Sequence, residues 1–293
     1  MSSQKQGLFK EAQEARVLPH FILVIVLALA FLIVGQMLGE VIFQNIWEFG
    51  DTIQVRLMMY LICSFIFISI LIFLWVKWIE KRKISSIGFY KKGFIKKYFI
   101  GFGIGVAMFS SVMLLLSVTR HTVIVENPSM PVGLMSISSI LIVLPGWMVQ
   151  SATEEILSRG WMMNVLGARY NTGLALGVSS VFFALLHIKN PNVTIIAILN
   201  IILVGLFLGI YVIKTNDLWG VCGLHCSWNW SQGNVFGLQV SGLQIETGSI
   251  LQLRLVGADW FTGGAFGPEG GIAVTLILVG SIILLIKKYN EED

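Results

Sequence analysis

Long apolar segments alternate with short polar segments along most of this sequence. A helix needs about 20 mostly apolar residues to cross a bilayer, so we expect these segments to form membrane-spanning helices. The fourth segment is too long for one straight helix, and Pro145-Gly146 predicts a break or kink within it. The expected spans cover residues 18–43, 57–76, 98–118, 132–166, 174–188, 193–213, 218–230 and 272–286.

The pattern predicts an all-α polytopic membrane protein with about eight transmembrane helices. The polar segments divide the chain into four parts. We expect a polar N-terminal segment (1–17), three transmembrane helices with a basic cytoplasmic loop (18–131), a second transmembrane region (132–288) and a short tail (289–293). Within the second region, a glycine-rich stretch precedes the last span.

Composition supports the membrane class. Of the 293 residues, 56% are apolar and only 12% are charged, which is about half the charge of a typical soluble domain. The net charge of +4 is explained by basic cytoplasmic loops, so we expect no nucleic-acid partner. Three cysteines, an odd number, do not favour a disulfide framework.

The distribution of lysine and arginine predicts the orientation. With the N-terminus inside, most of these residues fall in cytoplasmic segments. The opposite side holds only Arg56, Arg120, Lys189 and Arg254. Since basic residues gather in cytoplasmic loops, both termini are expected in the cytoplasm. No internal repeat is visible, which counts against the common transporter architectures.

Three charged residues lie inside the fourth span. Such residues are costly in lipid and are rare unless they face the protein interior and pair or react. Glu155 and Arg159 are four residues apart, so they share a helix face and are expected to pair and brace the helix. Glu154 points elsewhere and has no partner on its own helix. It is therefore the candidate general base.

Two other spans carry polar residues in pairs at the same spacing. Phe183 and His187 are four residues apart, as are His225 and Asn229. Each polar residue alone is more often a hydrogen-bonding contact between helices than a catalyst. Together with Glu154, however, they make a complete hydrolytic set. A carboxylate and an imidazole can activate water, and a second imidazole with an amide can stabilise an oxyanion.

These three motifs, EExxxR, FxxxH and HxxxN in this order, resemble those of the CPBP family. That family includes CAAX prenyl proteases of the Rce type and bacteriocin-processing or self-immunity proteins, also called Abi proteins. The resemblance covers about residues 132–230, and VSG at 240–242 and TGGAFGPEGG at 262–271 also look like bacterial members. It implies that residues 132–288 form the catalytic region of an intramembrane glutamate protease.

The resemblance also implies a role for each motif residue. Glu154 would be the general base, with His187 as its partner in activating water. His225 and Asn229 would form the oxyanion hole. The supporting residues would be Glu155, Arg159 and Phe183. No cofactor is expected. Glu154, His187 and His225 could in principle hold zinc, but the scheme uses every motif residue without a metal.

We therefore expect an intramembrane endopeptidase that cleaves a peptide or a lipid-anchored substrate near the cytoplasmic half of the bilayer. Its other partners would be membrane lipids, and its place would be the bacterial cell membrane, as a multi-pass protein. Two alternatives stay open. One is a self-immunity or scaffold protein that uses the same cavity without hydrolysis. The other, less favoured, is a proton-coupled transporter, since intramembrane Glu and His also mark proton relays. The sequence indicates no oligomeric state.

Overall fold

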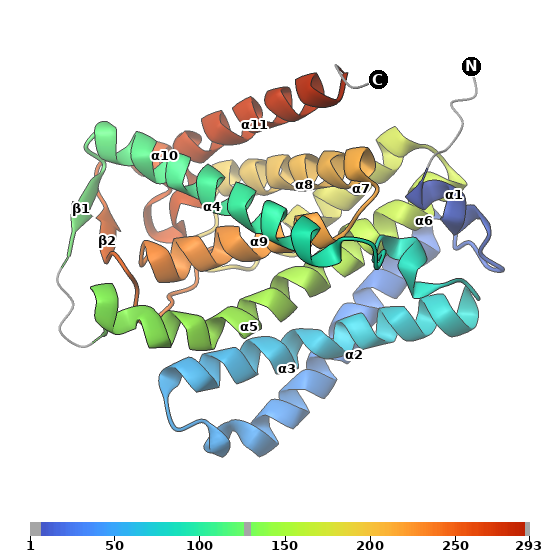
Figure 1. The fold of residues 1–293 in the computed structure, drawn as a ribbon, viewed down its shortest axis with the longest axis horizontal. Helices are drawn as coiled ribbons and strands as arrows, with labels where there is room; N and C mark the ends of the chain where they lie inside the picture. Colours follow the sequence, from blue (N-terminus) through green and yellow to red (C-terminus); the bar gives the residue numbers. More distant parts are fainter. Residues whose placement is uncertain (1–6, 126–129, 291–293) are drawn as a thin grey trace.

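The computed structural model describes residues 7–125 and 130–290, and it shows a helical bundle (Figure 1). The ends of two predicted parts, residues 1–6 and 291–293, lie outside the described residues. The α-helices are α1 (Leu8–Gln13), α2 (Phe21–Ile46), α3 (Ile53–Leu74), α4 (Phe94–Val118), α5 (Ile137–Glu155), α6 (Asn164–Arg169), α7 (Thr172–Leu185), α8 (Ile195–Thr215), α9 (Trp219–Trp230), α10 (Asp259–Thr262) and α11 (Ile272–Asn290).

Shorter elements join these helices. Three are π-helical: η2 (Trp75–Ile79), η5 (Ile156–Met163) and η6 (Ser231–Val235). The 3₁₀ turns are η1 (Trp47–Phe49), η3 (Ile84–Ile87), η4 (Gly133–Ser136), η7 (Gly264–Phe266) and η8 (Pro268–Gly270). The sequence did not predict the small antiparallel ribbon that β1 (Thr122–Ile124) and β2 (Leu253–Leu255) form at one end of the bundle (Figure 1).

Each predicted apolar segment contains a helix, and the chain is a multi-pass membrane protein. Within the described residues, 6 helical stretches are long and apolar enough to cross a bilayer. They are Phe21–Phe49, Ile53–Ile79, Phe94–Val118, Gly133–Arg169, Ile195–Thr215 and Ile272–Asn290. The other two segments form shorter helices, α7 with 14 residues and α9 with 12. The number of eight spans and the orientation of the termini stay predictions.

The fourth segment was predicted to break or kink at Pro145-Gly146. The helix α5 runs through Pro145 without a break, and its geometry changes later, at Ile156, where η5 begins. Gly146 suits this position because it has no side chain. A Cβ added there would lie 3.1 Å from the Met58 Cα and from the Leu61 side chain of α3, so the missing side chain lets α3 and α5 approach closely.

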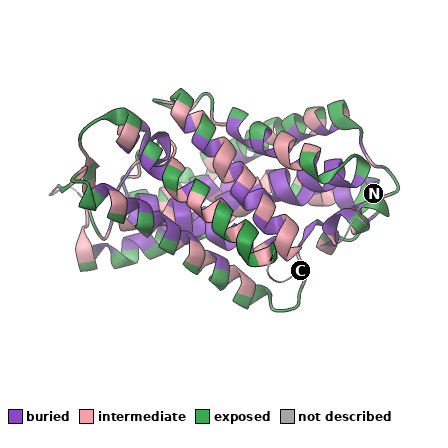
Figure 2. Cartoon of the chain, turned by 90° about the horizontal axis from the view of Figure 1, so that it is seen from above, coloured by how far each residue is buried: buried purple, intermediate pink, exposed green. Residues whose placement is uncertain are grey.

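Buried side chains concentrate along the middle of the bundle, while the outer helix faces are exposed and apolar (Figure 2). The closest packing joins α4 to α9. A Cβ on Gly101 would lie 1.8 Å from the Gly220 oxygen, and a Cβ on Gly223 would lie 2.1 Å from the Tyr98 oxygen. Because these glycines place α9 directly against α4, the opposite face of α9, which carries His225, faces α5.

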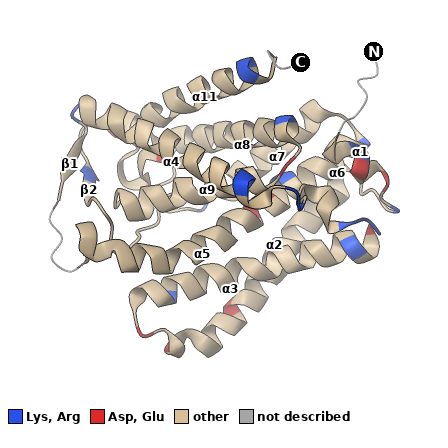
Figure 3. Cartoon of the chain, in the orientation of Figure 1, with Lys and Arg blue, Asp and Glu red and all other residues tan. Residues whose placement is uncertain are grey.

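The charges divide the bundle into two ends (Figure 3). The basic end is where α4 begins and where α8 and α11 finish, and it includes Lys97, Lys214 and Lys288. Lys97 pairs there with Asp217, with 2.7 Å between Nζ and Oδ2. The opposite end carries the β1–β2 ribbon and the loops 186–194 and 236–271. The location of the cavity can be given relative to these two ends.

Candidate active site

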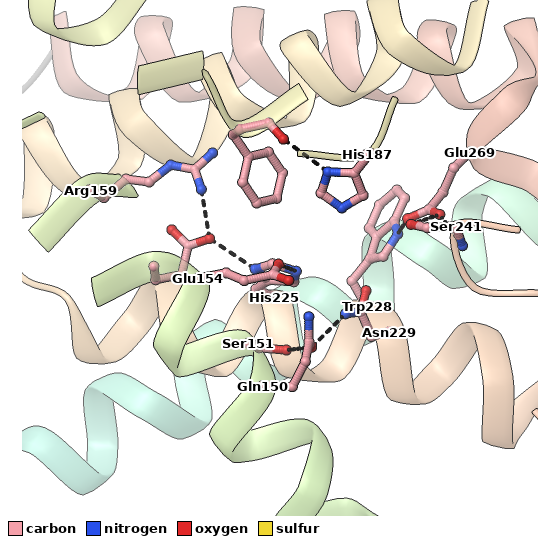
Figure 4. Close-up of polar contacts among 12 residues, drawn as sticks. Gln150, Ser151, Glu154, Arg159, His187, His225, Trp228, Asn229, Ser241 and Glu269 are labelled. Carbon is pink, nitrogen blue, oxygen red and sulfur yellow. Dashed lines mark hydrogen bonds and ion pairs between the residues drawn. The ribbon is translucent and has the colours of Figure 1, made fainter. Parts of the chain in front are cut away.

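One cavity, about 760 Å³ in volume, contains all four predicted catalytic side chains. Glu154 enters it from α5, His187 from the turn after α7, and His225 and Asn229 from α9. Figure 4 shows these side chains around a common space. The fold therefore brings together residues that are up to 75 positions apart in the chain, as 154 and 229 are.

Glu155 is the buried centre of the charged network. Its Oε1 atom accepts hydrogen bonds from Arg159 Nη1 at 2.9 Å and from His225 Nδ1 at 2.8 Å. The side chains of Glu155 and Arg159 are 0% exposed. The predicted pair is present, but it does more than brace its own helix. Through His225 it also joins α5 to α9, and it fixes the orientation of that imidazole ring.

Glu154 faces the other side of the same imidazole. Its Oε2 atom lies 3.6 Å from His225 Nε2, beyond hydrogen-bond distance. That oxygen is buried and has no hydrogen-bond partner among the described residues. His225 thus stands between two glutamates, bonded to one and near the other. The family resemblance paired Glu154 with His187, whereas the histidine at ion-pairing distance is His225.

His187 occupies a different setting from the one predicted. It lies in a turn, because α7 ends at Leu185 rather than continuing through the expected span. Its Nδ1 atom donates to the Phe183 carbonyl at 2.9 Å. The end of a helix leaves carbonyl groups without partners, and the imidazole satisfies one of them. This explains the spacing of four residues, and it leaves Nε2 as a lone-pair acceptor in the cavity.

The remaining motif residues complete the walls. Asn229 Nδ2 donates to Gln150 Oε1 at 3.0 Å, which holds the carboxamide between α9 and α5. The ring of Phe183 lies 4.4 Å from the Arg159 guanidinium carbon and 5.9 Å from the His225 ring. Phe183 therefore separates the buried arginine from the cavity while contacting the imidazole.

The π-helix η5 begins directly after Glu155. Such wide turns are uncommon in helices and occur often at functional sites. Here the change of geometry falls inside the EExxxR motif, between the glutamates and Arg159. The wider turn is the local structure in which Arg159 folds back onto Glu155.

Comparison with known families identifies the part of the chain that holds this site. Residues 136–231 match the family model described as type II CAAX prenyl endopeptidase Rce1-like. The chain carries an Rce1-like domain. None of the curated proteins and none of the solved structures matches the chain. The Rce1-like domain includes all three motifs and begins close to the predicted residue 132, so the resemblance seen in the sequence is confirmed.

Residues beyond the Rce1-like domain also line the cavity, and the sequence did not single them out. Glu269 Oε1 accepts from Trp228 Nε1 at 3.1 Å, and its Oε2 accepts from the Ser241 N–H at 2.8 Å and the Ser241 hydroxyl at 2.7 Å. Both residues fall in the two late motifs, VSG and GPEGG. A carboxylate in an apolar region was the signal available for Glu269. Gln150, inside the Rce1-like domain, was also missed.

The cavity extends from the middle of the bundle toward the end opposite the basic end. Its lining comes from the first part of α3, the final part of α9 and the loops near residues 189 and 241–245. The basic end, by contrast, is formed by the start of α4 and the ends of α8 and α11. The expectation that the site lies near the cytoplasmic half stays a prediction, because it depends on the orientation of the termini.

Metal binding has no ready cluster in this structure. Within residues 7–125 and 130–290, no group of three or more His, Cys, Asp or Glu side chains is arranged to hold a metal ion. Glu154 Oε2 and His225 Nε2 lie 3.6 Å apart, and within the same ranges no third residue of these types completes a cluster with them. Whether the Rce1-like domain works without a metal stays a prediction.

Proposed function

We propose that this protein is an intramembrane endopeptidase in which Glu154 activates the attacking water. The Rce1-like family is a family of CAAX prenyl endopeptidases, and the observation that carries the proposal is the state of Glu154. Its Oε2 is buried without a protein partner, beside the ordered imidazole of His225. A buried carboxylate oxygen left unpaired is costly. Glu155 Oε2 also lacks a partner, but of the two residues only Glu154 lines the cavity, where its oxygen can meet water.

The chemistry follows from the positions of the groups. Glu154 accepts a proton from water, and the resulting hydroxide adds to the carbonyl carbon of the scissile peptide bond. The tetrahedral intermediate carries negative charge on the former carbonyl oxygen. When the carbon–nitrogen bond breaks, the proton held by Glu154 passes to the leaving amine. The products are a carboxylic acid and an amine, with one water consumed.

His225 and Asn229 are placed to stabilise the oxyanion. An imidazole that carries both protons donates through Nδ1 to Glu155 and can donate through Nε2 into the cavity. Asn229 has two N–H groups, of which one is bonded to Gln150, so the other is available for the same oxygen. In this assignment Glu155 acts through His225 by holding its ring in place.

His187 has the complementary character. A backbone carbonyl can only accept, so the bond to Phe183 places the ring proton on Nδ1. The lone pair on Nε2 then accepts a hydrogen bond from water in the cavity. We assign His187 to orienting the water that Glu154 deprotonates, which keeps the role that the family resemblance implied.

The shape of the cavity supports a substrate that comes from the membrane. Its wall includes Leu29 and Ile33 of α2 and Ile188 beside the catalytic turn, and all three are exposed apolar side chains. Exposed apolar side chains on transmembrane helices face lipid. We propose a peptide or lipid-anchored substrate and, from the look of the late motifs, a bacterial cell membrane as the location.

The deciding experiment compares the peptides of membranes that contain the wild-type chain with those that contain Glu154→Gln. The substitution preserves size, so protein levels should be equal while a set of cleavage products disappears. Identical peptide sets in the two membranes would reject hydrolysis by Glu154. If the chain protects cells against a bacteriocin, protection that survives Glu154→Gln would favour the non-proteolytic immunity alternative.

A further inference from the structure

A short segment with neither helical nor strand structure, residues 244–246, joins two fixed ends beside the cavity. The first end is the tight turn Val240–Leu243, whose outer residues exchange two backbone hydrogen bonds of 2.9 Å. Glu269 holds this turn through the Ser241 N–H and hydroxyl. Asn190, in the loop that follows His187, donates to the Ser241 carbonyl at 2.9 Å. The turn is therefore tied to two other parts of the cavity wall.

The second end is Thr247, which is 1% exposed. Asn234 Nδ2 donates to its hydroxyl oxygen at 2.9 Å, and Gln54 Nε2 donates to its carbonyl at 3.1 Å. These bonds link the segment to η6 and to α3. With both ends bonded to the bundle, residues 244–246 have little freedom to move or to fold back on themselves.

Between these ends the backbone has no partners. Within the described chain, no hydrogen bond is made by the N–H or C=O groups of residues 244–246. Gln244 and Ile245 nevertheless line the cavity that holds Glu154. Ile245 packs against a buried cluster that includes Trp147 and Val240, which anchors the segment from behind. The result is a fixed segment with an unpaired backbone edge beside the site.

We propose that this edge binds the substrate as an added β-strand, with backbone hydrogen bonds to residues 244–246. The inference rests on the proposed function. An unpaired strand edge is a template for an extended peptide, because main-chain groups supply the affinity whatever the sequence. Backbone groups that have no partner within the protein are free to pair with those of a bound peptide. The substrate class is thus a locally extended peptide. A helical segment, whose backbone groups are already paired, would have to unwind first.

Strand geometry makes the proposal testable, because successive residues direct their N–H and C=O groups to opposite edges. The probe is a synthetic peptide that spans the most abundant cleavage site lost in Glu154→Gln membranes. It is made as a series with one N-methyl group moved along the backbone. Cleavage should weaken at alternate positions on one side of the scissile bond, with KM raised about threefold to tenfold per lost hydrogen bond.

A proline series in the protein provides the second arm. Proline removes a backbone N–H, and Gln244→Ala, Ile245→Ala and Glu246→Ala are the matched controls that keep it. KM should rise either for Ile245→Pro or for the two proline variants beside it, but not for all three. Thermal unfolding in detergent checks that each variant remains folded.

The possible outcomes distinguish a failure of the proposed strand pairing from a failure of the proposed function. A wild-type chain that cuts no peptide would remove both the proposed function and this inference. Cleavage with an equal response to N-methylation at every position, or with none, would remove the edge alone. An alternating response in either series supports it.

Discussion

Two carboxylates line the same cavity in opposite states. Each oxygen of Glu269 accepts at least one hydrogen bond, from Trp228 or from Ser241. Glu154 has one buried oxygen without a protein partner. A carboxylate whose oxygens are both hydrogen-bonded holds structure together, whereas one that has an unpaired oxygen and also lines the cavity can take a proton from water. The difference between the two regions lies in their hydrogen bonds, since both are largely buried.

The largest effect should come from exchanging the unpaired carboxylate for an amide. Glu154→Gln should lower kcat by about a thousandfold, because a general base is lost, while the midpoint of thermal unfolding should stay within a few degrees. Peptide cleavage in detergent and a thermal melt measure the two quantities. A variant that melts far below the wild type would mean that Glu154, like Glu269, is structural, and the comparison would collapse.

Glu155, the neighbour of Glu154 in the chain, should affect stability strongly. Glu155→Ala leaves Arg159 buried without its partner and His225 without its Nδ1 acceptor, so unfolding should become easier by about 3–5 kcal/mol. The double variant Glu155→Met with Arg159→Met removes both charges and should regain much of that stability without regaining activity. Equal stability of the single and double variants would contradict a buried charge pair. The measurement is denaturant unfolding of purified protein.

Asn229→Ala should act on the reaction rather than on folding. Removing one oxyanion donor lowers kcat by about a hundredfold in well-studied hydrolases. Gln150→Ala is the matched control, because it frees the carboxamide from its holding bond without deleting it, and its effect should be smaller. If Gln150→Ala reduced kcat as much as Asn229→Ala, the pair would be a structural contact between α5 and α9. Steady-state kinetics of both variants decide the question.

Local spacing allowed the charged motif to be predicted, and tertiary contacts explain what was missed. Glu155 and Arg159 are neighbours on one helix, so their pairing follows from the helical repeat alone. The bond from Glu155 to His225 joins residues 70 positions apart, and no periodicity reports it. Ser241 and Glu269 lie in glycine-rich turns that lack a period altogether, so their meeting in the cavity depends on the completed fold.

Helix ends were the weakest part of the prediction. The apolar run after Thr172 continues to Ile188, and hydropathy alone extends the span to that point. The chain turns at Leu186, and the loop that follows lies at the end of the bundle, where Asn190 donates to the Ser241 carbonyl. Pro145-Gly146 was expected to break or kink a helix, and α5 continues through it in close contact with α3 at Gly146. In both cases the contact joins residues far apart in the sequence, which hydropathy alone does not report.

Glu269 is the carboxylate of this comparison whose two oxygens are both hydrogen-bonded, and its removal should act on stability and on KM. Glu269→Ala leaves the indole N–H of Trp228 and the N–H of Ser241 without acceptors, so stability should fall by about 1–3 kcal/mol. The cavity wall should loosen, which raises KM about threefold to tenfold, while kcat stays within about twofold because no reacting group changes. A fall in kcat comparable to that of Glu154→Gln would assign Glu269 to the chemistry. Separate determination of kcat and KM distinguishes the two.

The smallest expected effect concerns Ser241, where a hydroxyl hydrogen bond and a strained backbone act in opposite directions on stability. Ser241 has φ 48°, in the left-handed region where residues with a Cβ are strained by about 1 kcal/mol. Ser241→Ala loses the hydroxyl bond and keeps the strain, whereas Ser241→Gly loses the bond and relieves the strain. The glycine variant should therefore be the more stable of the two by up to about 1 kcal/mol, although it is the larger deletion. The reverse order in thermal unfolding would mean that φ 48° at position 241 does not strain a residue with a Cβ.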